Sequence, residues 1–323
     1  MRYRRFPRCH WDVSEIGYGM WGMGGWTGSD DLASAAALDR AVDAGCNFFD
    51  TALAYGNGHS ETLLGALLQR HPTRRLIVAT KVPPLNRQWP GKGTTPVDQV
   101  FPYEHVMASA RVSLAHLGTE AIDLLQLHVW DDAWTSDSGW QRAATELKRR
   151  GIIRAFGISV NRWEPQNVLR ALQTGLVDAV QVVFNVFDQS PSDVLFPACQ
   201  RLDVAVIARV PFDEGSLTGT LTPESRWPEG DFRNLYFAPP NLAATLERVA
   251  PLQRLVSGWG MSLPDAVLRF ILAHAAVTTT IPGMRRVPHV EANLASSDAP
   301  PLDRAQIDQL GAFRWERTPD DRP

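Results

Sequence analysis

The sequence has little cysteine, little lysine and no long hydrophobic run. Its 323 residues include only three cysteines, Cys9, Cys46 and Cys199, which lie far apart and form no CxxC pair. We therefore expect neither a disulfide framework nor a structural zinc site. Arg4-Arg5 superficially resembles a twin-arginine signal, but no apolar stretch of signal-peptide or membrane-span length follows. These absences predict a protein of the reducing cytoplasm with no membrane partner.

A strong charge of either sign is also lacking. The formal net charge is −3, from 32 basic and 35 acidic residues, which argues against a nucleic-acid or membrane-surface protein. Hydrophobic residues make up 44% of the chain, enough for a large core, so disordered and fibrous classes are excluded. Only three of the basic residues are lysines, Lys81, Lys92 and Lys148. Because arginine is used almost everywhere else, each lysine is a candidate for a specific role.

Short apolar strands alternate with amphipathic helices after residue 15. We expect strands at 16–20, 47–50, 76–81, 122–128, 152–158, 179–183, 204–209 and 277–281. We expect helices from residue 30, from residue 60, at 103–117, 139–150, 164–173, 192–202 and 242–259, and after residue 288. Eight such pairs without a linker predict one α/β domain over residues 1–323, a (β/α)₈ TIM barrel, although the length alone would suggest two domains.

The segments outside the repeat also have expected roles. Residues 1–15 precede the first barrel strand and are expected to form a β-hairpin that closes the barrel bottom. Residues 303–313 predict an extra C-terminal helix. The segment 211–241 interrupts the seventh unit, and connections of that length usually carry function.

Residues 17–22 (GYGMWG) match the dinucleotide-binding pattern GxGxxG. That motif requires a helix that begins inside it. Here further glycines follow, and the next helix starts only near Asp30. The match is therefore weak evidence for a Rossmann domain.

Three predicted strands end in polar residues that a core would not choose: Asp50, Lys81 and His128. In a parallel barrel the carboxyl ends of the strands meet at one mouth. Tyr55 lies five residues after Asp50, in a loop that can fold over this mouth. A tyrosine hydroxyl has a free pKa of about 10, and a nearby ammonium lowers that pKa. We interpret the four residues as a proton-transfer set, in which Asp50 orients Lys81 and His128 positions a substrate oxygen beside Tyr55.

The segments around these residues resemble the aldo-keto reductase family. Residues 50–56 (DTALAYG) and 60–65 (SETLLG) look like its DTAxxYG…SExxLG signature, residues 79–82 (ATKV) like its lysine strand, and residues 123–128 (DLLQLH) like its histidine strand. The resemblance, which runs from residue 13 to residue 293, implies an NAD(P)H-dependent carbonyl reductase on a (β/α)₈ barrel. Tyr55 would be the general acid, supported by Lys81 and Asp50, and His128 would orient the carbonyl.

The resemblance also implies a set of cofactor-binding positions. They are Ser159, Asn161, Gln181, Arg209, Gly215, Leu217, Gly219, Arg285, Arg286 and Asn293. Ser159 and Gln181 would contact the nicotinamide carboxamide, and residues 215–219 resemble the loop beside the pyrophosphate. Arg209 falls where many members carry the aromatic ring that stacks on nicotinamide. Arg285 and Arg286 suit an adenosine 2′-phosphate, so we expect NADP(H), with NAD(H) as the alternative.

Aromatic residues predict a nonpolar substrate pocket. Trp21, Trp89 and Trp130 each lie just beyond a predicted strand, and Trp227 lies in the segment 211–241. Aromatic walls suit a small carbonyl compound and exclude water during hydride transfer. The sequence leaves the oligomeric state open, with a monomer as the simplest case.

Two other classes of function stay open. A barrel of this family can also act as a non-catalytic, NADP(H)-sensing regulatory subunit, although the presence of all four proton-transfer residues favours an enzyme. A metal-dependent barrel hydrolase or lyase would need clustered histidine and carboxylate ligands. His128 and Asp50 alone are too few for such a cluster, so we expect no metal.

Overall fold

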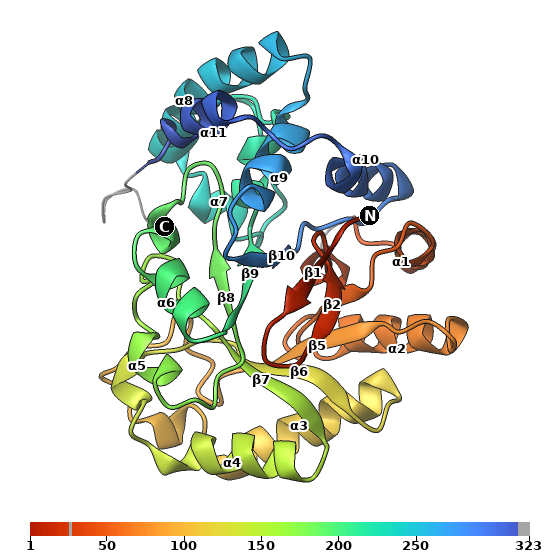
Figure 1. Ribbon diagram of the computed structural model, residues 1–323, viewed down its shortest axis with the longest axis vertical. Coiled ribbons are helices and arrows are strands. Elements are labelled where there is room, and N and C mark those ends of the chain that lie inside the picture. Colours follow the sequence, from red (N-terminus) through yellow and green to blue (C-terminus); the bar gives the residue numbers. More distant parts are fainter. Residues whose placement is uncertain (26–27, 316–323) are drawn as a thin grey trace.

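A computed structural model describes residues 1–25 and 28–315 of the chain. Eight parallel strands form one sheet in the order β10-β9-β8-β7-β6-β5-β4-β3 (Figure 1). They are β3 (Tyr18–Gly19), β4 (Phe48–Asp50), β5 (Ile77–Val82), β6 (Ile122–Leu127), β7 (Ile153–Ser159), β8 (Ala179–Val183), β9 (Ala205–Arg209) and β10 (Val277–Thr280). Bridges from Ile16 to Thr280 and from Gly19 to Gly283 join the two edges. The sheet therefore curls into a nearly closed barrel.

Helices surround the barrel (Figure 1). They are α1 (Asp31–Asp43), α2 (His59–Arg70), α3 (Tyr103–Leu117), α4 (Ser138–Arg149), α5 (Leu169–Leu172), α6 (Leu195–Arg201), α7 (Arg233–Tyr236), α8 (Pro239–Gly258), α9 (Leu263–Leu272), α10 (Val287–Asp298) and α11 (Arg304–Gly311). Short 3₁₀ turns lie at η1 (Trp21–Met23), η2 (Val97–Gln99), η3 (Asp132–Trp134), η4 (Ser190–Ser192) and η5 (Asp213–Thr218).

No single helix in the described parts of the chain is long and apolar enough to span a membrane. The helices α8 and α9 reach that length and composition only together, across an 86° bend.

Two apolar clusters hold the barrel together. The larger one fills the space between the strands and the surrounding helices. The smaller one lies inside the barrel and includes Phe48, Ala79 and Leu124, one residue from each of three neighbouring strands. Because successive side chains of a strand point to opposite faces, Asp50 and Lys81, two positions further along, also belong to the inner face. The polar side chains at the ends of β4 and β5 therefore point into the barrel mouth.

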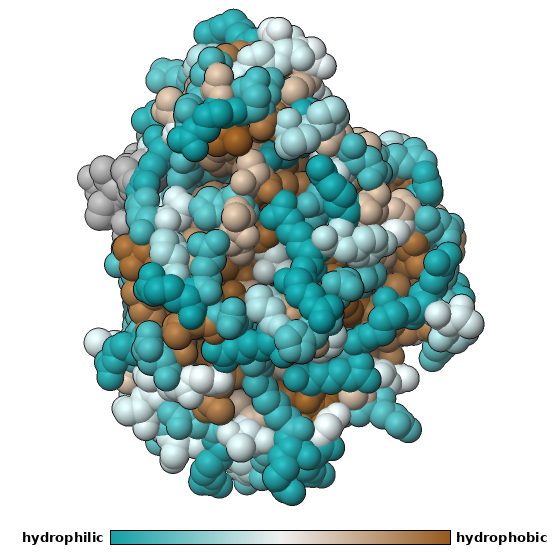
Figure 2. Space-filling model, in the orientation of Figure 1, coloured by the Kyte–Doolittle hydropathy of each residue, from teal (hydrophilic) through white to brown (hydrophobic). Residues whose placement is uncertain are grey.

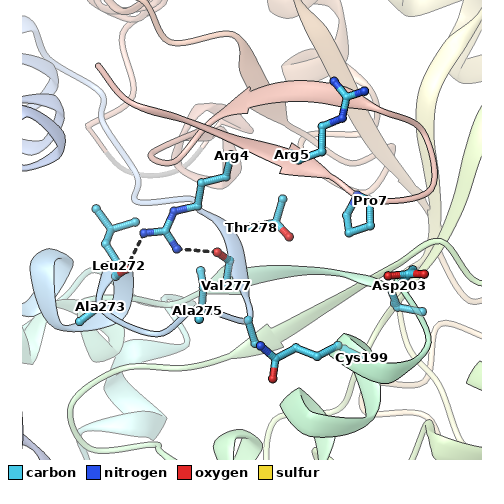
Figure 3. Close-up of a pocket in the computed structure, with 13 residues that line it drawn as sticks. Arg4, Arg5, Pro7, Cys199, Asp203, Leu272, Ala273, Ala275, Val277 and Thr278 are labelled. Atoms are coloured by element: carbon cyan, nitrogen blue, oxygen red, sulfur yellow. Dashed lines mark hydrogen bonds between the residues drawn. The ribbon is translucent and has the colours of Figure 1, made fainter.

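The hairpin of β1 (Tyr3–Phe6) and β2 (Trp11–Ser14) covers the opposite end of the barrel, its floor. Phe6 is part of the inner apolar cluster. The Arg4 guanidinium donates to the carbonyl oxygens of Leu272 (2.5 Å) and Val277 (2.7 Å), across a hollow that the hairpin shares with α6 and α9 (Figure 3). Hydrophilic residues cover most of this face of the molecule (Figure 2). The hollow thus belongs to the floor and not to the mouth.

The barrel, the N-terminal hairpin and the extra C-terminal helix are confirmed, and the differences are local. The helix expected at 164–173 is reduced to α5, because Glu164 and Asn167 are held in turns that precede it. The sequence analysis missed α9, although its Ser262 cap and the i,i+4 pair of Asp265 and Arg269 on its polar face are recognisable helix signals. The segment 211–241 is not a simple loop, since it contains η5 and α7.

Candidate active site

A buried ion pair lies at the centre of the mouth. Lys81, on β5, is fully buried, and Asp50, at the end of β4, is 2% exposed. The Lys81 Nζ donates to the Asp50 Oδ2 at 2.5 Å and to the Thr51 carbonyl oxygen at 2.8 Å. The other Asp50 oxygen accepts hydrogen bonds from the Nε2 atoms of Gln181 (2.8 Å) and Gln126 (3.2 Å). This one carboxylate therefore has partners on three other strands, β5, β6 and β8.

Tyr55 lies directly above the ion pair. The Lys81 Nζ is 3.4 Å from the Tyr55 hydroxyl oxygen and 5.0 Å from the centre of its ring. Burial raises the pKa of the phenol, and the Asp50 charge adds to that rise, whereas the charges of Lys81 and Arg209 lower it. Protonated Tyr55 is therefore stable at neutral pH, and the two cations favour the phenolate that forms when it gives up its proton.

The loop that carries Tyr55 is held in place by the motif residues around it. The Glu61 carboxylate is fully buried, and it accepts from the Thr80 hydroxyl at 2.6 Å and pairs with the His116 ring at 2.9 Å. A Cβ at Gly65 would lie 2.7 Å from the His116 carbonyl oxygen, so only glycine lets α2 approach α3 this closely. Gly56 has a φ of +63° and leaves no room for a Cβ against Gly24. The motif thus fixes the loop relative to β5.

His128 directly follows β6 and lies on the other side of Tyr55. Its ring packs edge-on against Tyr55 at 5.6 Å and against Trp89 at 4.6 Å between ring centres. Burial, together with the charges of Lys81 and Arg209, holds the pKa of His128 well below its usual value. Its Nδ1 is buried and has no hydrogen-bond partner within residues 1–25 and 28–315. The ring is therefore a neutral, unsatisfied polar group facing the mouth.

The strand ends across the mouth carry three of the predicted cofactor residues. Ser159 ends β7 and Gln181 lies on β8, and both are buried. Arg209 ends β9, and its Nη2 donates to the Val160 carbonyl oxygen at 3.0 Å. Gln126, which binds Asp50, is a residue that the sequence analysis missed. It lies two residues before His128 and so on the same face of β6. This period of two could have identified Gln126 from the sequence.

The loop residues of the predicted cofactor set are placed differently. The side-chain amide of Asn161 donates to the Gly91 carbonyl oxygen (3.0 Å) and to Glu164 (3.2 Å), so it ties two loops together. Gly215, Leu217 and Gly219 lie at η5, where Leu217 is fully buried and both glycines have positive φ. The backbone of this segment, rather than the Leu217 side chain, is available to a ligand.

An arginine-centred cluster, absent from the sequence analysis, anchors η5. Arg162 donates to Asp213 at 2.7 Å, to Glu214 at 3.0 Å and to Asp188 at 3.4 Å. Its guanidinium lies 4.6 Å from the ring centres of both Trp163 and Tyr236. Burial raises the pKa of Glu214, and the Arg162 charge opposes that rise. The cluster joins the segments that follow β7, β8 and β9 to α7.

Arg285, Arg286 and Asn293 follow β10. Arg286 is exposed at the start of α10, and Asn293 is a buried residue of the same helix. Burial and the charges of Arg233 and Arg286 lower the pKa of Arg285, which marks a local excess of positive charge. A Cβ at Gly22 would lie 2.9 Å from the Arg285 Cδ, so this side chain packs on the segment after β3.

The four tryptophans do not share one environment. Trp89 is 48% exposed beside His128, and Trp21 is 36% exposed against Phe232, at 6.0 Å between ring centres. Trp227 stacks on Phe237 within the segment 211–241. Trp130 lies apart from the mouth, because it is fully buried in the larger apolar cluster between the strands and the helices. Its indole nitrogen donates to Asp132, and its ring packs on Trp140.

Comparison with known proteins assigns the chain to a family. Residues 15–314 match the Aldo/keto reductase family, and the chain belongs to it. The chain is 29% identical to the uncharacterized oxidoreductase YqkF of Bacillus subtilis over 96% of its length and 95% of the relative. It is 27% identical to the NADH-specific methylglyoxal reductase of Escherichia coli, covering 88% of the chain and 90% of that protein.

Solved structures share the fold. The glycerol dehydrogenase of Gluconobacter oxydans superposes with a TM-score of 0.80 at 25% identity, covering 96% of this chain and 94% of that one. An aldo/keto reductase of Klebsiella pneumoniae in complex with NADP and acetate gives a TM-score of 0.72 at 21% identity, with 98% of both chains covered. The protein is therefore an oxidoreductase of the aldo/keto reductase family. No group of three or more His, Cys, Asp or Glu side chains that could hold a metal ion occurs among its described residues.

The environment of His128 makes a prediction about its protonation. Because burial and two cations lower the pKa of His128, the ring should still be neutral at a pH where an unperturbed histidine, with a pKa of about 6.5, is half protonated or more. ¹⁵N NMR of histidine-labelled protein measures this directly, and the spectrum of His128→Gln assigns the signal. Imidazolium shifts for His128 at pH 6 would contradict the described site.

Proposed function

We propose that this protein reduces aldehydes or ketones to alcohols with NADPH, with Tyr55 as the general acid. The observation that carries the proposal is the contact between the Tyr55 hydroxyl and the buried Lys81 ammonium, at 3.4 Å. The ammonium and Arg209 stabilise the phenolate electrostatically, so Tyr55 can release its proton at the moment a carbonyl oxygen becomes negative. Asp50 orients the Lys81 ammonium through their buried ion pair.

His128 supports the same step from the opposite side. Its neutral ring cannot compete with Tyr55 as an acid, but it can donate one hydrogen bond to the carbonyl oxygen and so hold that oxygen near the phenol. Trp89 packs against this ring and is itself half exposed. We propose that Trp89 and Trp21 line the entrance for a small carbonyl substrate.

The residues across the mouth suit a nicotinamide cofactor, which when bound supplies the hydride. Two buried polar atoms, the His128 Nδ1 and the Arg209 Nε, lack partners within the described parts of the chain, so the mouth is incomplete without a ligand. Ser159 and Gln181 would hold the carboxamide, and the backbone around Gly215 the pyrophosphate. Arg285 and Arg286 would bind the adenosine phosphate, which favours NADP(H) over NAD(H).

Tyr55→Phe tests the role of the general acid. Turnover of a generic aldehyde should fall by about 10²- to 10⁴-fold, whereas the Kd for NADPH should be unchanged, because only the hydroxyl is removed. Tyr103→Phe is the matched control: the Tyr103 hydroxyl contacts Glu146 on the surrounding helices, and its loss should leave the rate intact. Full activity of Tyr55→Phe would refute the mechanism. NADPH binding by a wild-type protein that reduces no carbonyl would support the regulatory alternative instead.

Arg285→Gln combined with Arg286→Gln tests the choice of cofactor. Because charge-assisted hydrogen bonds to phosphate are lost, the KM for NADPH should rise by about tenfold or more. The KM for NADH, which lacks the 2′-phosphate, should change little. Steady-state kinetics with both cofactors measures this, and an equal rise for NADPH and NADH would contradict the assignment.

A further inference from the structure

Arg209 is a half-buried cation with a buried Nε and no acidic partner among the residues that the structure describes. Its Nη2 donates to the Val160 carbonyl oxygen at 3.0 Å. Its Nε has no hydrogen-bond partner, and no carboxylate forms an ion pair with it, within residues 1–25 and 28–315. Arg162 is the useful contrast, because three carboxylates surround that guanidinium. Withdrawing a charged group from water without pairing it is costly, and a buried Nε without a partner leaves this guanidinium only partly satisfied.

The neighbouring charges are already neutralised by one another. Lys81 is paired with Asp50. Glu214, whose charge also acts on Arg209, forms its ion pair with Arg162 and accepts a hydrogen bond from that guanidinium. Arg162 itself opposes the charge of Arg209. Among Lys81, Arg162 and Arg209, the last is therefore the cation that no carboxylate of the described residues pairs with, and its charge can act on a ligand bound beside it.

The positive charge of Arg209 acts on both Tyr55 and His128, the residues proposed to contact the carbonyl oxygen. Arg209 ends β9, whereas Tyr55 and His128 follow β4 and β6, and its charge lowers the pKa of both. A hydride donor must lie about 3 to 3.5 Å from the carbonyl carbon. Tyr55 and His128 occupy the β4–β6 side of that carbon. The β7–β9 side remains for the nicotinamide ring, where Ser159 ends β7, Arg209 ends β9 and Gln181 lies on β8.

We propose, on the basis of the function proposed above, that Arg209 makes the site distinguish the two redox forms of its cofactor, so that NADPH binds more tightly than NADP⁺. The reduced ring is neutral. Loss of a hydride, with its two electrons, leaves a ring with one positive charge, which the guanidinium repels. The protein then releases NADP⁺ readily and is weakly inhibited by it. The same guanidinium favours the Tyr55 phenolate, which offsets its repulsion of the oxidised ring during the reaction.

Binding measurements without substrate test the proposal. The Kd values for NADPH and NADP⁺ are determined by titration calorimetry for wild type, Arg209→Met, Arg209→Gln and Arg209→Lys, at one pH and one salt concentration. In the wild type, the Kd for NADP⁺ should exceed that for NADPH. In Arg209→Met and Arg209→Gln the ratio of the two should fall by about tenfold, mainly through tighter NADP⁺ binding. Arg209→Lys should retain most of the ratio, because it keeps the charge.

Controls separate this proposal from its alternatives. Arg304→Met removes a charge from the exposed surface of α11 and should leave both Kd values unchanged. Parallel weakening of both forms in Arg209→Met would mean that Arg209 binds a phosphate, and would overturn the proposal. An unchanged ratio, with a higher KM only for carbonyl substrates that carry a carboxylate, would overturn it in favour of a substrate-anion site. Absence of any binding to the folded wild type would instead refute the proposed function.

Discussion

The buried Lys81–Asp50 ion pair is the interaction on which the rest of the mouth depends. Neither side chain has significant contact with water, and removing either partner of such a pair typically costs about 3–5 kcal/mol. Asp50 satisfies its remaining oxygen with Gln126 and Gln181. The pair therefore connects four barrel strands and at the same time supplies the ammonium that contacts Tyr55. The same Lys81 and Asp50 atoms thus stabilise the fold and position the ammonium next to the Tyr55 hydroxyl.

Charge in the mouth is divided between two separate clusters. The Lys81–Asp50 pair lies under Tyr55, and the Arg162 cluster ties together the segments after β7, β8 and β9. The second cluster also holds η5 and the turn before it. Val210, Asp213 and Glu214 have positive φ there, a conformation that costs non-glycine residues free energy. Arg209 lies between the two clusters and is paired with neither, which leaves its charge available to a ligand.

The sequence predicts those parts of the site that depend on local patterns. Asp50, Lys81 and His128 can be located because a strand end and a period of two are visible in a few consecutive residues. The Arg162 cluster cannot, since its partners come from segments that meet only after the barrel has closed. Trp130 shows a further limit: its position just after a strand does not reveal that its indole turns outward to Trp140. The helix α9 is a different case, because its Ser262 cap and its i,i+4 pair of Asp265 and Arg269 are visible in the sequence and could have predicted it.

The most direct test of the central claim is the pKa of Tyr55, measured by NMR of ¹³Cζ-labelled tyrosine. The Lys81 charge lowers this pKa and the Asp50 charge raises it. Lys81→Met should therefore shift the pKa of Tyr55 upward, and Asp50→Asn should shift it downward. Shifts of the same sign in both variants, or no shift in either, would contradict an ion pair that controls the acid.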